Sequence, residues 1–306
     1  MRMRRLGNDG PTVSVVGLGC NNFGMRVDLD GTRAVVDAAL DAGITLFDTA
    51  DIYGGTGGSE SFLGEVLEGR RDRVVLATKF GGDMGDGTEA RGSREYIRKA
   101  VEASLQRLRT DYIDLYQYHT PDKVTPLAET FGALDELVRE GKARYVGHSN
   151  LSAEQVEEVD GLAREHGWAR PVSAQNRYSL LHRDPEEDLL PVCERLGLGV
   201  LPYFPLASGL LTGKYRRGEA RPKGTRLESR DEVFTDEVFD RVEALKSFAQ
   251  ERGVTLLDVA IGGLAAQPAV GSVISGATKP EQVRANAAAG DWEPTADDLA
   301  ALDAIR

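Results

Sequence analysis

The sequence predicts a single (β/α)8 barrel, the TIM-barrel architecture, over residues 1–306. Two observations support this. Short apolar runs alternate with stretches of helical periodicity along the whole chain, which is typical of parallel strands buried on both faces. No change of composition marks a domain boundary, so eight such units fit one closed barrel better than an open sheet with a second domain.

The predicted strands are short runs rich in β-branched and aromatic residues, bounded by glycine, proline or charged residues. In chain order they cover residues 12–16, 44–47, 74–78, 112–118, 143–147, 172–174, 198–201 and 270–274.

Helical spacing of apolar residues predicts the elements between the strands. The first helix places Val35, Ala38 and Ala39 on one face and ends at Gly43. A long irregular segment is expected from Ser208 to Phe234, after the seventh strand. The predicted helices cover residues 30–42, 59–67, 93–108, 126–140, 153–166, 186–196, 239–250, 256–266 and 280–289, with a short tail helix after Thr295.

Composition limits the classes of function and location. A net charge of −12 argues against a nucleic-acid partner or an anionic membrane surface. The two cysteines, Cys20 and Cys193, cannot build a disulfide framework and lack metal-ligand spacing, so reduced thiols and a cytoplasmic location are expected. Asn8, Asp9, Gly10 and Pro11 stand after the basic start, where a signal peptide would have its apolar segment. No apolar run is long enough to cross a bilayer.

Glycines after the first strand suggest a dinucleotide-binding turn, but their spacing does not fit one. After Gly17 and Gly19 the third glycine of that fingerprint belongs at position 22, which is Asn22. The better interpretation is that these glycines leave space for a ligand near the end of the strand.

Single polar residues follow most of the predicted strands. Because the carboxyl ends of barrel strands meet on one face, we expect these residues to gather at one mouth. They stand at positions 48, 79, 119, 149, 175 and 203.

Four of the residues at this mouth suggest acid–base chemistry. Asp48 and Lys79 end neighbouring strands, so a buried ion pair is expected between them. A cation near the phenol of Tyr53 would lower its pKa from about 10 and let it donate a proton near neutral pH. His119 could bond the same reacting oxygen. The alternative is a structural salt bridge beside a structural histidine.

Other chemistries lack their motifs. There is no Gly-x-Ser-x-Gly, no His-Glu-x-x-His and no Walker pattern. The four histidines are too scattered to predict a metal site, and Asp48 is the one convincing carboxylate for a glycosidase pair.

Taken together, the strand-end motifs resemble those of the aldo-keto reductases over nearly the whole chain. The matching segments are Phe47-Asp48-Thr49-Ala50-Asp51-Ile52-Tyr53-Gly54, Thr78-Lys79, Tyr118-His119, Gly147-His148-Ser149-Asn150, Gln175-Asn176 and Pro205-Leu206-Ala207-Ser208-Gly209-Leu210-Leu211-Thr212-Gly213-Lys214.

The resemblance implies an enzyme that uses NADPH, or less often NADH, without a metal, to transfer hydride to an aldehyde or ketone. The implied partner is therefore a small-molecule carbonyl substrate, and the oligomeric state stays open. Tyr53 matches the family's general acid, Lys79 and Asp48 the pair that tunes it, and His119 the residue that orients the carbonyl.

The resemblance also implies a set of cofactor contacts. Ser149, Asn150 and Gln175 match positions that hold the nicotinamide carboxamide, and Tyr203 matches the aromatic under its ring. The other implied contacts are Asp48, Gly19 and Cys20 near the first strands, Leu206, Ser208 and Lys214 along the pyrophosphate, and Gly276, Thr278, Lys279, Gln282 and Asn286 at the adenosine end.

Two departures from the family pattern bear on these contacts. Many relatives carry Arg where Gln282 stands, which weakens the preference for NADP over NAD, and a small hydroxyl residue where Phe204 stands. Asn21 and Asn22 could contact a hydroxylated substrate or simply cap the first turn. A cofactor-sensing regulatory subunit, as ion-channel β subunits are, is the alternative function, and an enzyme acting on phosphorylated sugars is a weaker one.

Overall fold

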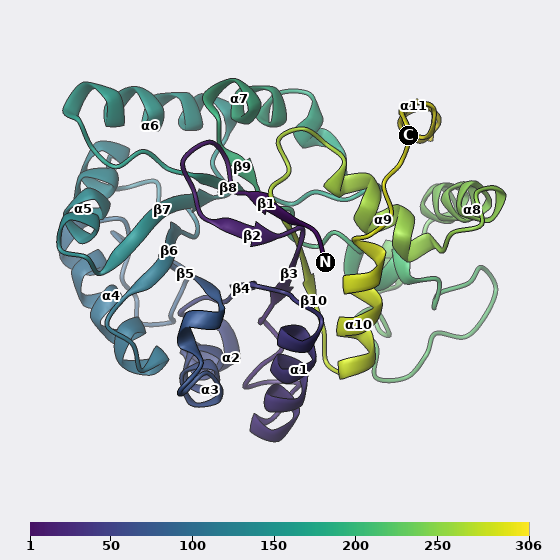
Figure 1. Cartoon of the computed structure of the whole chain (residues 1–306), viewed down its shortest axis with the longest axis horizontal. Helices are drawn as coiled ribbons and strands as arrows, with labels where there is room; N and C mark the ends of the chain where they lie inside the picture. The colour runs from purple at the N-terminus through teal and green to yellow at the C-terminus, as the bar shows by residue number, and fades with distance from the viewer. Residues whose placement is uncertain (306) are drawn as a thin grey trace.

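Eight parallel strands form one sheet in the computed structural model, which describes residues 1–305. Their order is β10-β3-β4-β5-β6-β7-β8-β9, so each strand lies beside its neighbour along the chain (Figure 1). Their bounds are β3 Val16–Gly19, β4 Leu46–Asp48, β5 Val75–Phe80, β6 Ile113–Tyr118, β7 Ala143–Ser149, β8 Ser173–Gln175, β9 Gly199–Val200 and β10 Val273–Gly276.

Backbone hydrogen bonds between the two ends of the sheet close the barrel. The N–H of Val200 in β9 donates to the carbonyl of Ala269 at 2.6 Å, and the N–H of Gly271 donates to the carbonyl of Val200 at 2.9 Å. The N–H of Ile274 in β10 reaches the carbonyl of Pro202 at 3.2 Å. The predicted barrel fold is confirmed.

Helices surround the strands, as expected of parallel strands buried on both faces (Figure 1). Side-chain hydrogen bonds cap the N-termini of several helices. At the start of α6, for example, the hydroxyl of Ser152 accepts from the backbone N–H of Gln155, and the side chain of Gln155 accepts from the backbone N–H of Ser152. The helices are α1 Leu29–Asp41, α2 Tyr53–Thr56, α3 Gly58–Val66, α4 Arg94–Leu108, α5 Leu127–Arg139, α6 Ala153–His166, α7 Leu189–Leu196, α8 Asp236–Glu251, α9 Leu256–Ala265, α10 Pro280–Ala289 and α11 Ala296–Asp303.

The tail helix after Thr295 and the irregular segment at 208–234 are both confirmed. That segment contains only two short 3-10 turns, η3 Ala207–Thr212 and η4 Asp231–Val233; two more, η1 Arg71–Arg73 and η2 Asp184–Glu186, lie elsewhere. Within residues 1–305, no helix has both the length and the apolar character that a bilayer span requires.

The first predicted strand is wrong in part, because residues 12–16 belong to two different strands. β1 (Met3–Arg5) and β2 (Thr12–Ser14) form an antiparallel hairpin, and the barrel strand begins only at Val16. The β-branched run continues through this break without glycine or proline, so the pattern does not reveal it. In Figure 1 the hairpin lies across the centre of the ring of strands.

The hairpin completes the core inside the barrel. Leu6, which follows β1, is fully buried and packs in one cluster with Leu46, Leu115 and Leu201 from three barrel strands or their ends. A Cβ added at Gly199 or Gly271 would lie only 2.4 or 2.5 Å from Leu6 Cδ1, so these two glycines make room for it. The larger core cluster fills the layer between strands and helices.

We predict that Leu6→Ala destabilises the fold by about 2–5 kcal/mol, because it opens a cavity at the end of the barrel interior. The measurement is the free energy of unfolding in denaturant. Met3→Ala is the matched control, since Met3 on the same hairpin is 49% exposed and its loss should change little. Equal effects of the two substitutions would contradict a packed role for Leu6.

Candidate active site

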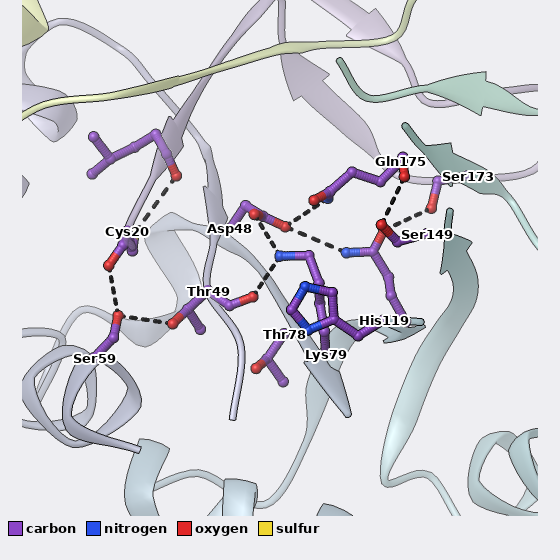
Figure 2. A network of polar contacts seen from close by, with 12 residues as sticks. Cys20, Asp48, Thr49, Ser59, Thr78, Lys79, His119, Ser149, Ser173 and Gln175 are labelled. Carbon is purple, nitrogen blue, oxygen red and sulfur yellow. Dashed lines mark hydrogen bonds and ion pairs between the residues drawn. The ribbon is translucent and has the colours of Figure 1, made fainter. Parts of the chain in front are cut away.

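A buried ion pair lies at the carboxyl end of the barrel strands. Lys79 Nζ, from β5, is 2.7 Å from Asp48 Oδ2, at the end of the adjacent strand β4. The same ammonium donates to the carbonyl of Thr49 at 2.8 Å, and Figure 2 shows it between these two oxygens. Lys79 is 0% and Asp48 3% exposed, so the pair is almost entirely removed from water.

Two glutamine side chains complete the environment of Asp48. Its second oxygen accepts from Gln175 Nε2 at 2.9 Å and from Gln117 Nε2 at 3.3 Å. Burial alone would lower the pKa of Lys79, but Asp48 and Tyr53 outweigh it and raise that pKa above the usual 10.5. Lys79 is therefore a cation at neutral pH.

Tyr53 begins α2, directly after the loop that follows β4. Its ring centroid lies 5.0 Å from Lys79 Nζ and meets the His119 ring edge-on, with centroids 5.8 Å apart. Gly54 has φ +74°, and a Cβ there would lie 2.5 Å from the N of Ser59, so only glycine fits this turn. Glycine thus lets the chain turn back immediately after Tyr53.

The sequence predicted a lowered pKa for Tyr53, and this direction is wrong. Burial raises the pKa of Tyr53 above its usual 10, and the Lys79 ammonium only limits that rise. The sequence suggests the nearby cation but not how deeply the phenol is buried. Tyr53 is thus a protonated phenol at neutral pH, held beside a fixed positive charge.

His119 follows β6 and is a neutral imidazole. Burial, followed by the charge of Lys79, lowers its pKa to about 3. Its backbone N–H donates to the carbonyl of Phe80 at 2.8 Å, while its side-chain Nδ1 is buried and has no partner within residues 1–305. A neutral imidazole can donate one hydrogen bond to a ligand oxygen.

Ser149, Asn150, Gln175 and Tyr203 join the same network. Ser149 Oγ donates to the carbonyl of Gln175 at 2.7 Å. Asn150, at φ +60°, donates from Nδ2 to the carbonyl of His119 at 2.9 Å and accepts at Oδ1 from the Tyr203 hydroxyl at 2.9 Å. The structure therefore brings these four residues together with the predicted catalytic four.

Gly19, Cys20 and Gly276 lie at adjoining strand ends. Gly19 of β3 pairs with Gly276 of β10, and the N–H of Cys20 donates to the carbonyl of Asp48 at 2.9 Å. Cys20 is fully buried, and burial raises the pKa of its thiol well above the usual 9.0. Its thiol thus stays protonated and packs as a small core side chain.

The predicted pyrophosphate contacts lie on a strained turn after β9. Phe204, Ala207 and Ser208 all have positive φ, which is rare for residues with a side chain. The carbonyl of Leu206 accepts from the N–H of Gly209 at 2.8 Å. Lys214 folds back over that glycine, where a Cβ would lie 2.6 Å from its Nζ.

Apart from Gly276, the predicted adenosine contacts share no hydrogen bond with this network within residues 1–305. At the start of α10 the backbone N–H and the hydroxyl of Thr278 both donate to Gln282 Oε1, at 2.8 and 3.1 Å. Lys279 is exposed and Asn286 is buried. Among the described hydrogen bonds, none joins these four side chains to Asp48 and its partners.

Sequence reasoning missed Gln117 and Arg226. Gln117 lies in β6, two residues before His119, so alternation continued past the strand end would have placed both on the inner face. Arg226 gave no such signal, because it lies in the non-periodic segment after η3. Its Nη2 donates to Asn22 Oδ1 at 3.4 Å, its guanidinium lies 5.4 Å from the Phe204 ring centroid, and it has no acidic partner within residues 1–305.

Asn22 stabilises the turn after β3 through its backbone. Its carbonyl accepts from the N–H groups of Arg26 and Val27, each at 3.0 Å, and its Nδ2 donates to the carbonyl of Ala277 at 3.4 Å. Among residues 1–305, no group of three or more His, Cys, Asp or Glu could hold a metal ion.

We predict that Asp48→Asn lowers the free energy of unfolding by about 3–5 kcal/mol at pH 7, because Lys79 then lacks its counter-charge. In the wild-type chain the raised pKa of Lys79 stabilises the fold at pH values below its unfolded pKa, and this stability is lost as pH rises through the folded value. Without Asp48, burial lowers that pKa, so the deficit should shrink as pH rises towards 10. Denaturant unfolding at the two pH values measures this.

The double variant Asp48→Asn with Lys79→Met is the control for that experiment. It removes the uncompensated charge and should recover part of the stability. A deficit that is the same at both pH values, with no recovery in the double variant, would exclude the ion pair as its cause.

Sequence similarity relates this chain to known proteins. The Aldo/keto reductase family matches residues 15–306. A relative from Arabidopsis thaliana, "Probable voltage-gated potassium channel subunit beta", is 36% identical over 96% of this chain and 92% of its own length. "Uncharacterized oxidoreductase YrpG" from Bacillus subtilis (strain 168) is 38% identical over 93% of this chain and 89% of its own.

A further relative from Escherichia coli (strain K12) has a named substrate. This "L-glyceraldehyde 3-phosphate reductase" is 35% identical, over 94% of this chain and 86% of its own length. Both the family match and these identities extend over nearly the whole chain. The chain therefore belongs to the aldo/keto reductase family of oxidoreductases.

Proposed function

We propose that this protein interconverts aldehydes or ketones and alcohols by hydride transfer, in the reducing direction or the reverse, with NADPH or alternatively NADH as cofactor and Tyr53 as the general acid. The observation that supports this best is the buried Lys79–Asp48 pair, with its ammonium 5.0 Å from the Tyr53 ring centroid and His119 edge-on to that ring. A structural salt bridge has no need of a phenol and an imidazole beside it.

Tyr53 donates the proton in this scheme. Its raised pKa keeps the phenol protonated at neutral pH, so the donor form is always present. As the substrate oxygen gains negative charge it becomes basic enough to take the proton. Tyr53 is a phenolate once it has donated its proton. The Lys79 ammonium then stabilises this phenolate, and Asp48 keeps Lys79 in place.

His119 orients the carbonyl. With a pKa of about 3 it is neutral throughout the physiological range, so it acts as a hydrogen-bond donor and not as a proton source. The ring lies beside Tyr53, so both side chains can meet one oxygen atom.

Residues at the barrel mouth suit a nicotinamide cofactor. Several buried polar atoms within residues 1–305 lack a partner, and three of them belong to residues at or next to the ends of β6, β8 and β10: His119 Nδ1, Asn176 Oδ1 and Ser275 Oγ. Ser149, Asn150 and Gln175 would hold the carboxamide, and Tyr203 would lie against the ring. When bound, the reduced nicotinamide supplies hydride to the carbonyl carbon.

The remaining cofactor contacts are proposed along the rim. Gly19, Cys20, Leu206, Ser208 and Lys214 would follow the dinucleotide, while Gly276, Thr278, Lys279, Gln282 and Asn286 would hold its adenosine end. Arg226 adds a cation without an acidic partner beside Asn22, which suits phosphate oxygens.

A second candidate is a cofactor-binding regulatory subunit with little turnover. The relatives from Arabidopsis thaliana and Oryza sativa subsp. japonica, 36% and 37% identical, are both "Probable voltage-gated potassium channel subunit beta". A panel of aldehydes, ketoses and alcohols, assayed with NADPH and NADH, separates the two. Tight cofactor binding without turnover would favour the regulatory subunit.

We predict that Tyr53→Phe lowers the rate of carbonyl reduction by about 10²–10⁴-fold, because the proton donor is lost while the ring remains. NADPH binding, measured by fluorescence titration, should be almost unchanged. Tyr112→Phe is the control, since Tyr112 packs under Arg71 and Arg144 outside this network. Wild-type turnover in Tyr53→Phe would exclude the acid role.

We predict that Gln282→Arg strengthens binding of NADPH over NADH by about 10- to 100-fold. A guanidinium there could form a charge-assisted bond with a 2′-phosphate, worth about 1.5–3 kcal/mol, while NADH has no such group. Dissociation constants for both cofactors measure this, with Gln282→Met as the uncharged control. An equal change for the two cofactors would place position 282 away from the 2′-phosphate.

A further inference from the structure

Asp51 is a buried carboxyl that the proposed reaction does not use. It is 2% exposed, and its Oδ1 is fully buried without a partner within residues 1–305. It lies on the turn between β4 and α2, two residues before Tyr53. Burying a carboxyl with one oxygen unpartnered is costly, so its presence here calls for a reason.

The backbone of this turn is bonded directly to the catalytic pair. The N–H of Asp51 donates to the carbonyl of Lys79 at 3.0 Å, and Lys79 Nζ donates to the carbonyl of Thr49 at 2.8 Å. The N–H of Tyr53 donates to the carbonyl of Ala50 at 3.1 Å. A shift of Asp51 would therefore be transmitted to both Tyr53 and Lys79.

A second buried carboxylate, Glu60 of α3, takes the partners that could have neutralised Asp51. Glu60 is 0% exposed; its Oε1 accepts from the hydroxyl of Thr78 at 2.5 Å, and its Oε2 accepts from Arg107 at 2.6 and 2.7 Å. Asp51 forms no ion pair of its own among the described residues.

Titratable groups from four elements interact electrostatically with Asp51. They are Glu60 of α3, Arg107 and Tyr96 of α4, Lys79 of β5 and Tyr116 of β6. Arg91 donates to the Tyr96 hydroxyl at 3.0 Å, whereas the buried Tyr116 hydroxyl has no partner within residues 1–305. The cluster thus holds two unpartnered polar atoms, Asp51 Oδ1 and Tyr116 Oη.

Burial, and then the charge of Glu60, raise the pKa of Asp51 to about 7, against the opposing effects of Arg107, a backbone hydrogen bond from Ile52 and Lys79. The catalytic residues titrate elsewhere, since the pKa of His119 is about 3 and those of Tyr53 and Lys79 lie above their usual values of 10 and 10.5. Between pH 6 and 8, Asp51 is therefore the group beside Tyr53 that changes charge.

We propose that Asp51 is a positioning residue for Tyr53: its neutral form keeps the turn packed beside Glu60, and its ionised form is repelled by Glu60 and displaces Tyr53 from Lys79. Only the effect on rate rests on the proposed reductase activity. The effect on the position of Tyr53 is a property of the folded chain itself.

The first test is NMR of the chain labelled with 13C at the ring carbons of its nine tyrosines, with the Tyr53 signal assigned by its absence in Tyr53→Phe. The expected result is a Tyr53 shift that changes with a midpoint near pH 7 in the wild-type chain and stays constant in Asp51→Asn. Asp41→Asn, at the exposed end of α1, should keep the wild-type midpoint.

Two results would overturn the proposal. One is a Tyr53 signal that does not move between pH 6 and 8 in the wild-type chain, and the other is an unchanged midpoint in Asp51→Asn. Glu60→Gln gives a second test should Asp51→Asn fail to fold. Without the like charge of Glu60, the midpoint should move to lower pH, and a midpoint that stays in place would count against the proposal.

The kinetic test is kcat for carbonyl reduction at saturating cofactor. We expect kcat to fall by up to about 10-fold from pH 6 to pH 8 in the wild-type chain, because a single carboxyl with a pKa of about 7 goes from about nine-tenths to about one-tenth neutral over that range. In Asp51→Asn, kcat should stay at its pH 6 value up to pH 8. A wild-type pH profile in that variant would overturn the proposal. A chain without turnover at any pH would refute the reductase function alone, because the NMR test decides the role of Asp51 without turnover.

Discussion

The burial of the Lys79–Asp48 ion pair constrains much of the surrounding structure. Both charges lose nearly all contact with water, so the protein must supply each bond that water would have made. Thr49, Gln117 and Gln175 do so, from the ends of β4, β6 and β8. A slip of any of these strands by one residue would turn its side chains to the other face and leave a buried charge without a partner. The pair therefore fixes the register of the barrel as well as its chemistry.

The sequence predicted the barrel well, because strands and helices with strong periodicity leave a direct pattern. It also predicted that Asp48, Lys79 and His119 would meet, since carboxyl ends of parallel strands converge. It missed the hairpin of β1 and β2, because no glycine or proline separates β2 from the barrel strand β3. It missed Arg226, whose position depends on how an irregular segment packs. The pKa direction of Tyr53 was wrong because burial depth is a property of the packed structure.

The rim segments carry positively charged side chains, whereas the protein as a whole is negatively charged. The chain carries a net charge of −12, yet Lys214, Lys279 and Arg226 lie on the rim segments without acidic partners within residues 1–305. At physiological salt, charges more than about 8 Å apart are largely screened where they face solvent. An anionic ligand close to the rim would therefore interact mainly with these cations, and the acidic remainder of the surface would weaken its approach only at low ionic strength.

The pairing of Gly19 with Gly276 joins the first barrel strand to the last. During synthesis on the ribosome, β3 emerges long before β10 exists, so its outer edge stays open until almost the whole chain has been made. Contacts this distant in sequence are slow to form, and an open strand edge is prone to wrong pairing. We therefore expect the nascent chain to depend on chaperones, and truncations near the C-terminus to aggregate instead of yielding a smaller folded barrel.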